Sequence, residues 1–161
     1  TGTLLGSKDL LDFAHLNPTI EVRPIAKTHS LSKLAALPRF TAINSALEVD
    51  LSGQANTEIA GGRYVGAIGG ALDFLRGARA SHGGVPILAL PSTAEVRGQV
   101  SSRIVARLSG PAAIGRADAS IIVTEYGIAD LRGLSLSERL KKMVAIAHPD
   151  FRDSFRKTAN L

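Results

Sequence analysis

The sequence predicts an α/β domain with a mostly parallel sheet flanked by helices, and three observations support this prediction. Segments with the apolar pattern of strands alternate along the chain with segments of helical spacing. Two of the apolar segments, 85–90 and 121–123, are short and continuous, as expected for strands covered on both faces. A glycine cluster over 66–70 directly precedes the helical spacing of 71–80, which is typical of a chain entering a helix.

In the first part of the chain, the pattern predicts short helices and strands. Residues 4–16 and 30–37 have helical spacing of apolar side chains, and a proline follows each segment closely, which favours a helix end. Residues 20–25 alternate like a strand until a proline interrupts them. The period of two from Phe40 to Leu51 predicts a strand with one buried face.

The second half of the chain continues the alternation. The segments 101–108 and 118–124 have strand patterns, and the segments 135–147 and 150–158 have helical ones. The helix predicted over 135–147 opens with Ser-Leu-Ser-Glu, a capping-box sequence in which the first serine and the glutamate bond each other's backbone N–H groups.

The composition is that of an ordinary globular domain. The 161 residues are 45% apolar and 20% charged, which predicts a single domain over 1–161. Nineteen basic against fourteen acidic residues give a net charge of +5, which favours an acidic ligand. Because aromatic residues make up only 4% and like charges form no long run, no nucleic-acid partner is expected, and a polyphosphate small molecule fits better.

Several other classes are disfavoured by what the sequence lacks. Without cysteine, there are no thiolate nucleophiles, disulfides or zinc–thiolate sites, and the four histidines are too scattered to suggest a metal site. No segment approaches the roughly 18 apolar residues of a membrane span, and no signal peptide opens the chain, so we expect a cytoplasmic protein without a membrane partner. The chain begins with threonine instead of methionine, which suggests a fragment or a processed product.

The glycine cluster is the best candidate for a ligand site. Gly66, Ile68, Gly69 and Gly70 precede a predicted helix, where the missing Cβ atoms let a ligand approach and the helix N-terminus supplies free N–H donors. Glycine pairs are equally common in tight turns that bind nothing, so the glycines alone leave both interpretations open. The dinucleotide and Walker A fingerprints are absent, and the cluster indicates an anion without identifying it.

Other polar groups give a weaker signal. The loops 91–94 and 124–127 follow predicted strands and are expected to meet the glycine cluster at the carboxyl edge of the sheet. The spacing of the acidic residues singles out no acid–base pair, and Ser92 lacks a neighbouring base and a nucleophile-elbow sequence. The candidate acids and bases are Glu48, Asp50, Glu58, Asp73 and Glu125.

Six segments, in order, resemble the C-terminal domain of the acetyl-CoA hydrolase/transferase family. That family includes the acetate, succinate and 4-hydroxybutyrate coenzyme A transferases, and the similarity covers nearly the whole chain. The segments are INSALEVDLSGQAN (43–56), GAIGGALDFLRGA (66–78), ALPSTA (89–94), SRIV (102–105), VTEYGIADLRG (123–133) and AIAHPDFR (145–152).

The resemblance implies that residues 1–161 are the C-terminal half of a larger two-domain enzyme. Such enzymes pass coenzyme A from an acyl-CoA to a small, acetate-like carboxylate through a glutamyl-CoA thioester. The family's nucleophilic glutamate lies before the segment that matches Thr1, so this chain alone is expected to be inactive, and Glu125 is not given that role. The implied partners are the missing N-terminal domain and the acyl-CoA and carboxylate substrates, with a second copy as a further candidate in a homodimer. No tightly bound cofactor is expected.

The resemblance also implies roles for individual residues. A backbone amide of Gly69 or Gly70 is expected to bind the thioester oxyanion, with Gly66 and Ile68 contacting coenzyme A beside it. Asn44 is expected to orient the acyl or carboxylate group, and Arg97 is expected to meet a coenzyme A phosphate. Residues 97–99 and 109–115 depart from the family's pattern, which leaves the coenzyme A contacts and the substrate open.

Two other functions remain open from the sequence. In an acetyl-CoA hydrolase, water instead of a carboxylate would resolve the acyl-enzyme, and the motifs do not separate this reaction from transfer. A non-catalytic acyl-CoA-binding module would use the same anion site and would need no partner domain.

Overall fold

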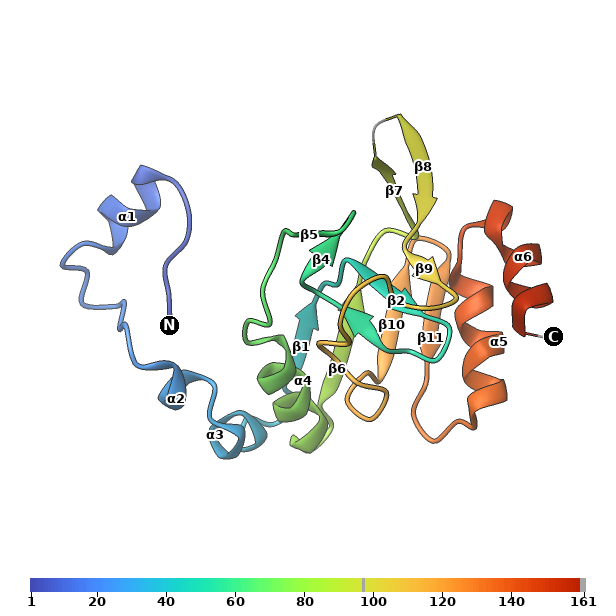
Figure 1. Cartoon of the computed structure of the whole chain (residues 1–161). Coiled ribbons are helices and arrows are strands. Elements are labelled where there is room, and N and C mark those ends of the chain that lie inside the picture. Colours follow the sequence, from blue (N-terminus) through green and yellow to red (C-terminus); the bar gives the residue numbers. More distant parts are fainter. Residues whose placement is uncertain (97, 160–161) are drawn as a thin grey trace.

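A four-stranded sheet forms the centre of the fold in the computed structural model, which describes residues 1–96 and 98–159 (Figure 1). The strand order is β1-β6-β10-β11, where β1, β6 and β10 are parallel and β11 runs antiparallel to β10. The prediction of an α/β fold with a mostly parallel sheet is confirmed. The strands are β1 (Thr41–Asn44), β6 (Val85–Ala89), β10 (Ile121–Thr124) and β11 (Gly127–Asp130).

A second sheet packs on the core side of the first. Its strands are β3 (Ala55–Asn56), β2 (Glu48–Asp50) and β9 (Ile104–Val105), with β2 parallel to β9 and antiparallel to β3. The single strand predicted from Phe40 to Leu51 is therefore wrong, because β1 and β2 belong to different sheets. The half-buried guanidinium of Arg103 donates hydrogen bonds to the carbonyls of Ala46 and Leu47, which removes them from any strand ladder. Burial lowers the pKa of Arg103.

Two hairpins complete the strands. The first joins β4 (Ile59–Ala60) to β5 (Arg63–Tyr64), and the second joins β7 (Thr93–Val96) to β8 (Gln99–Ser102) and projects from the body (Figure 1). The strand predicted over 101–108 is accordingly divided between this hairpin and the second sheet. The turn of the first hairpin has positive φ at both Gly61 and Gly62, as a two-residue turn of the right twist requires.

All five predicted helices are confirmed. Of the predicted segments, 4–16, 30–37, 71–80, 135–147 and 150–158 all contain a helix, and the capping box before Leu136 forms. The strand predicted over 20–25 is wrong, because Pro24 lies directly before a short helix and fixes the backbone there. The helices are α1 (Lys8–Ala14), α2 (Ile25–Thr28), α3 (Leu31–Ala35), α4 (Ala71–Ala80), α5 (Leu136–Ile146) and α6 (Pro149–Ala159).

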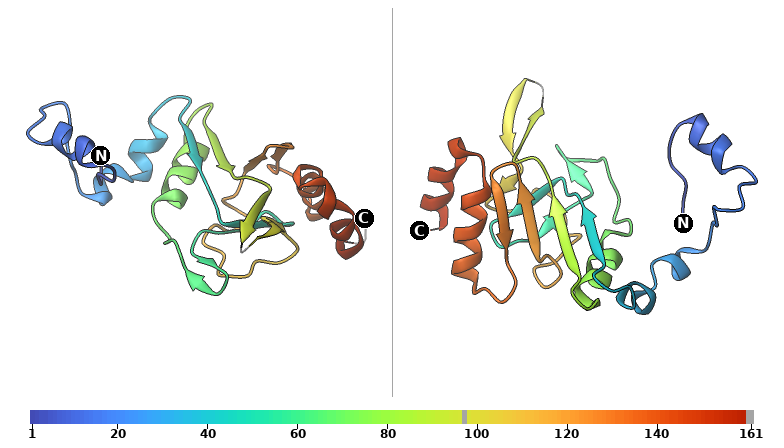
Figure 2. Two further views of the ribbon diagram at one scale, coloured as in Figure 1. Left: turned by 90° about the horizontal axis from the view of Figure 1, so that it is seen from above. Right: turned by 180° about the vertical axis from the view of Figure 1, so that it is seen from behind.

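The hydrophobic core lies on one face of the four-stranded sheet. Leu88 and Ile122 on this face pack in one cluster with Leu75 of α4, Val49 of the second sheet and Met143 of α5. Within the described residues, no helix covers the opposite face (Figure 2, right). The expectation that 85–90 is covered on both faces is therefore wrong, because alternate side chains of β6 are only half-buried.

We call this opposite side the outer face and define it by Ile43, Ile87, Val123 and Ile128. The strand register pairs Ile43 with Ile87 and Val123 with Ile128. Ile43 and Ile128 are each 67% exposed, and the two central side chains are half-buried.

Residues 1–37 form an arm that extends away from the body (Figures 1 and 2). Neither α1 nor α2 has a buried residue. Leu34 of α3 joins the arm to the body by packing on Gly77 of α4, where an added Cβ would lie 2.5 Å from the Leu34 Cβ. In the described ranges, no helix has the length and apolar character that crossing a membrane requires.

Candidate functional site

The glycine cluster forms an exposed loop that leads into α4. Gly69 has a φ of 58°, which glycine adopts at little cost, and Gly70 is the N-cap of α4 without a side-chain cap. Ile68, which lies between Gly66 and Gly69 in this loop, is 62% exposed. Within the described part of the chain, no protein group accepts a hydrogen bond from the N–H of Ile68, Gly69 or Gly70. These N–H groups are therefore available to a ligand.

The glycine loop is held against the turn that precedes β4. The N–H groups of Val65 and Gly66 donate to the carbonyl of Glu58 at 2.9 and 3.1 Å, and the Thr57 hydroxyl donates to the carbonyl of Ala67 at 3.2 Å. A Cβ at Gly66 would overlap the carbonyl oxygen of Thr57. The loop can approach this turn so closely only because residue 66 is glycine.

The side chain of Asn56 also holds this turn in place. Its fully buried side chain accepts hydrogen bonds from the N–H groups of Glu58 and Ile59 at 2.9 and 3.0 Å. Its amide group donates to the carbonyl of Ile59 at 2.7 Å and to the Glu48 carboxylate at 3.0 Å. Glu48 also accepts from the Ser109 backbone at 2.5 Å and hydroxyl at 2.9 Å. Glu48 therefore anchors a turn and is not a free general base.

His29 lies against the other side of the loop, a neighbour that the sequence patterns do not reveal. A Cβ at Gly70 would overlap the His29 ring, which also packs edge-on against Phe74 with ring centroids 4.7 Å apart. The Thr28 hydroxyl lies 2.9 Å from Nδ1 of His29. The arm thus reaches the N-terminus of α4, and Gly70 leaves room for the ring.

Asn44 ends β1 on the side of the sheet that faces the core. Its half-buried side chain lies on the same face of the sheet as that of buried Ala42, and its carboxamide hydrogen-bonds no other group within the described residues. The chain runs from α4 through a short turn to the start of β6, so the N-terminus of α4 is the end nearer the carboxyl edge of the sheet, where Asn44 lies. Arg97, the predicted phosphate contact, lies outside the described residues.

A cleft of about 480 Å³ opens at the carboxyl ends of β6 and β10. Pro91 and the pair Thr124–Glu125 line it, so the predicted meeting of the loops after these strands is confirmed. The glycine loop does not line this cleft. The sequence predicted that the glycine cluster and the loops 91–94 and 124–127 would meet at one cleft. In this chain, only the two strand loops do so.

Ser92 and Glu125 form a pair beside this cleft. The Glu125 carboxylate accepts hydrogen bonds from the Ser92 backbone N–H at 2.8 Å and from its hydroxyl at 2.6 Å. Burial raises the pKa of Glu125, but the hydrogen bonds from Ser92 and the nearby His148 outweigh it and lower the pKa overall. Such a carboxylate is a poor base, and the fully buried Ser92 acts as a donor and not as a nucleophile.

Replacing Glu125 by glutamine is expected to remove part of the acid sensitivity of the fold. The folded-state pKa lies below the ordinary 4.5, so the ionised side chain adds stability above pH 4.5 that is lost as the pH falls through the lowered pKa. Thermal midpoints of the protein and of Glu125→Gln should differ at neutral pH and converge as the pH falls through the lowered pKa of Glu125. The effect is small because Glu125 is exposed. A difference that does not change with pH would contradict an ionised pair.

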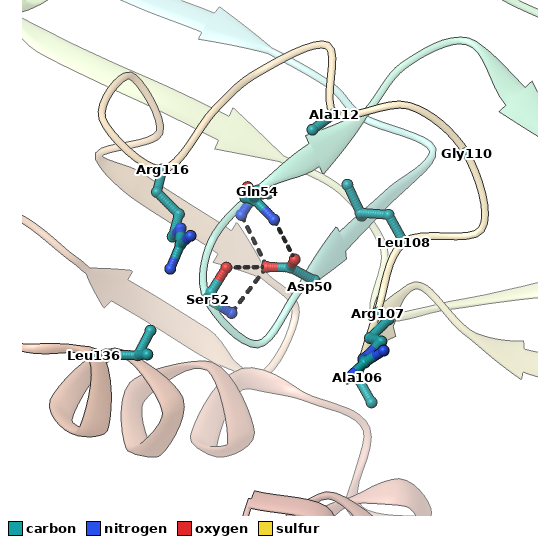
Figure 3. Close-up of a pocket in the computed structure, with 10 residues that line it drawn as sticks. All are labelled: Asp50, Ser52, Gln54, Ala106, Arg107, Leu108, Gly110, Ala112, Arg116 and Leu136. Atoms are coloured by element: carbon teal, nitrogen blue, oxygen red, sulfur yellow. Dashed lines mark hydrogen bonds between the residues drawn. The ribbon is translucent and has the colours of Figure 1, made fainter.

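A larger cleft of about 640 Å³ lies beside the end of β2 (Figure 3). Asp50, a candidate acid, accepts hydrogen bonds from the backbone and hydroxyl of Ser52 at 2.8 and 2.7 Å and from the backbone and amide of Gln54 at 3.0 and 2.9 Å. Asp50 thus closes its own turn. Arg107 and Arg116 line the same cleft. The described residues contain no group of three or more His, Cys, Asp or Glu side chains placed to hold a metal ion.

Comparison with known proteins gives a consistent result. The model of the acetyl-CoA hydrolase/transferase C-terminal domain matches residues 6–159. The chain is 40% identical over 157 residues to the butyryl-CoA:acetate CoA-transferase of Anaerostipes caccae, a match that covers 96% of this chain and 35% of that protein. The chain thus spans about a third of the length of curated relatives that it matches.

Two solved structures are similar along almost the whole chain. RipA from Yersinia pestis has a TM-score of 0.84 and 38% identity over 97% of this chain and 34% of its own. The 4-hydroxybutyrate CoA-transferase of Porphyromonas gingivalis has a TM-score of 0.76 and 41% identity over 96% of this chain and 35% of its own.

Proposed function

The chain belongs to the acetyl-CoA hydrolase/transferase family through that family's C-terminal domain, and from this premise we propose that it is the C-terminal part of a coenzyme A transferase. The longer enzyme moves coenzyme A from an acyl-CoA to a small, acetate-like carboxylate in the cytoplasm. Its nucleophile is a glutamate that lies outside residues 1–161 and forms a glutamyl-CoA thioester. Residues 1–161 alone are then inactive, and coenzyme A takes part as a substrate instead of a bound cofactor.

The free N–H groups of Gly69 and Gly70 are the observation that carries this proposal. When a carboxylate attacks a thioester carbonyl, negative charge develops on the carbonyl oxygen. Backbone donors aimed at that oxygen, at the positive end of a helix, stabilise the charge as it forms, and each is worth about 3 kcal/mol. Within this proposal, Gly69 and Gly70 bind the oxyanion while Gly66 and Ile68 shape the coenzyme A contact.

Two polar side chains complete the proposed site. Asn44 has an uncommitted carboxamide at the same edge of the sheet and is proposed to orient the acyl or carboxylate group. Arg97 is proposed to contact a coenzyme A phosphate. The net charge of +5 suits a ligand that carries several phosphates.

Trapping the thioester tests the proposal. The full-length gene product is incubated with an acyl-CoA and no acceptor, reduced with borohydride, and digested for mass spectrometry. A glutamate reduced to its alcohol is expected outside residues 1–161, because the thioester carbonyl is the group that borohydride reduces. A modified Glu125 or Glu48, or no acyl-CoA-dependent modification, would contradict the proposal.

The same experiment tests Asn44. The Asn44→Ala variant should form the trapped species about tenfold more slowly, since an orienting group contributes to the rate without supplying the nucleophile. Asn17→Ala, which changes an amide in the arm, should not change the rate. Equal rates for the protein and Asn44→Ala would remove Asn44 from the site.

Hydrolysis is the second candidate, because the family description includes hydrolases as well as transferases. In that reaction, water takes the place of the acceptor carboxylate. Coenzyme A release from an acyl-CoA, measured with and without added acetate, separates the two reactions. A transferase produces acetyl-CoA when acetate is present. An acyl-CoA-binding module would bind substrate and release nothing in either case.

A further inference from the structure

Three arginines surround a small pocket at the amino edge of the four-stranded sheet. The pocket has a volume of about 180 Å³, and Arg79, Arg132 and Arg139 line it together with the buried Ser120. The arginines come from three places: the last turn of α4, the segment after β11, and α5. Among the described residues that line the pocket, none carries a carboxyl group.

The pocket lies at the end of the domain opposite the glycine loop. Asp130, the last residue of β11, pairs with Ile121, the first residue of β10, so Ser120 and Arg132 lie at the amino edge of the sheet. The glycine loop leads into the first turn of α4, whereas Arg79 is in its last turn (Figure 1). Since α4 has ten residues, its two ends are about 15 Å apart at about 1.5 Å per residue. The pocket is therefore separate from the proposed oxyanion donors.

The side chains of Arg79 and Arg139 are fixed by the backbone around the pocket. Nη1 of Arg79 donates to the carbonyl of Ala117. Nη1 of Arg139 donates to the carbonyls of Ser52 and Arg116 at 3.2 and 3.1 Å. A guanidinium has five N–H donors, and in the described part of the chain Nε and Nη2 of both arginines have no hydrogen-bond partner. Both side chains are therefore held in position while several of their donors remain available.

Arg132 reaches the pocket from a turn. Its Nε and Nη2 donate to the Asp130 carboxylate at 2.9 and 2.7 Å, and its Nη1 has no partner among the residues that the structure describes. Gly133 follows with a φ of 70°, and an added Cβ there would meet no atom within 4 Å. The chain thus turns toward α5 without adding a side chain to this part of the pocket lining.

The positive charges around the pocket are only partly balanced by the protein. Asp130 pairs with Arg132, but neither Arg79 nor Arg139 forms an ion pair within the described residues. Positive charges gathered around one hollow repel each other, and a bound anion removes that cost. Arginine N–H groups bind phosphate oxygens in pairs, and a phosphate monoester carries a charge of about −1.5 to −2 at neutral pH. The pocket is smaller than the sites of drug-sized ligands, so it fits a phosphate group and not a whole nucleotide.

We propose that this arginine pocket, defined by Arg79, Arg132 and Arg139, binds a phosphate group, either as the free ion or as part of a small phosphorylated molecule. The pocket goes beyond the proposed function, because its residues lie at the opposite edge of the sheet from the glycine loop. Its ligand is therefore expected to bind independently of coenzyme A.

Isothermal titration of the full-length gene product with inorganic phosphate, at an ionic strength kept constant with chloride, tests this site. Phosphate should bind at one site per chain. Arg132→Gln should raise the dissociation constant at least about tenfold, because a charge-assisted hydrogen bond contributes about that factor to binding. Arg79→Gln, which changes another exposed arginine of the pocket, should have a similar effect.

Arg156→Gln is the matched control for Arg132→Gln. Arg156 bonds the Asp153 carboxylate at 2.7 Å, as Arg132 bonds that of Asp130 at 2.7 Å, and the two arginine side chains are 53% and 50% exposed. Arg156 belongs to α6 and does not line the arginine pocket. The control removes the same charge and the same kind of ion pair, and it should leave phosphate binding unchanged.

A second titration, with glycerol phosphate, distinguishes the two sources of the phosphate group. Equal or tighter binding of the ester assigns the pocket to a phosphorylated molecule, and tighter binding of the free ion assigns it to inorganic phosphate. No binding of either, or equal binding by the protein and Arg132→Gln, overturns the proposal. Displacement of phosphate by excess coenzyme A would assign the arginines to that substrate and would also overturn it. Thermal unfolding curves of the variants without phosphate confirm that the fold is retained.

Discussion

Replacing Gly66 by alanine is expected to lower coenzyme A transfer by the proposed full-length enzyme about a hundredfold, because it moves the proposed oxyanion donors away from the reacting carbonyl. The added Cβ would overlap the carbonyl oxygen of Thr57, which is backbone and cannot turn aside. The loop must then leave the turn that holds it and carry Gly69 and Gly70 with it. Steady-state kinetics should show the loss in kcat, since the donors act on the transition state more than on bound substrate.

Gly115→Ala is the matched control for this substitution. Gly115 has an ordinary φ, and a Cβ there meets no atom within 4 Å. The control should leave transfer unchanged and stabilise the fold slightly by restricting the unfolded chain. If Gly66→Ala retains full activity in a folded protein, the glycine loop does not lie at the reacting centre.

Replacing Asn56 by alanine is expected to lower the free energy of unfolding by about 3 kcal/mol, because a buried side chain that hydrogen-bonds four half-buried groups is lost at once. The side chain is fully buried and bonds two N–H groups, one carbonyl and the Glu48 carboxylate. Urea unfolding of the protein and the variant measures the difference.

Asn17→Ala provides the control for Asn56→Ala. Asn17 makes similar local bonds, to the carbonyl of Phe13 and to the backbone and hydroxyl of Thr19, but these are exposed. Water replaces such bonds, so the expected loss is below about 1 kcal/mol. Equal losses for the two variants would show that burial does not set the cost at Asn56.

The sequence predicts best those elements whose signals are local. The helix α5 follows from its capping box and apolar stripe, and β10 from a short apolar segment. The alternation of side chains does not predict the break between β1 and β2, where Arg103, a residue distant in the sequence, donates hydrogen bonds to two carbonyls. Alternation of side chains cannot report a bond of that kind.

The candidate site likewise contains some features that the sequence indicates and others that only the folded structure reveals. The glycine loop was found because glycines before a helix have a known geometric meaning. The Ser92–Glu125 pair and the packing of His29 against Gly70 depend on how separate elements come together, and no spacing in the sequence encodes either contact. The role of Asp50 was open for the same reason, since its bonds to Ser52 and Gln54 become visible only in the folded turn.

The guanidinium of Arg103 also has a mechanical consequence. Arg103 directly precedes β9, and its guanidinium binds the link between β1 and β2. The two sheets therefore cannot hinge at residues 45–47 without breaking those bonds. These bonds therefore restrain the end of β1, at Asn44, relative to β9. Any motion of one sheet relative to the other at this link would first have to break the bonds from Arg103 to the carbonyls of Ala46 and Leu47.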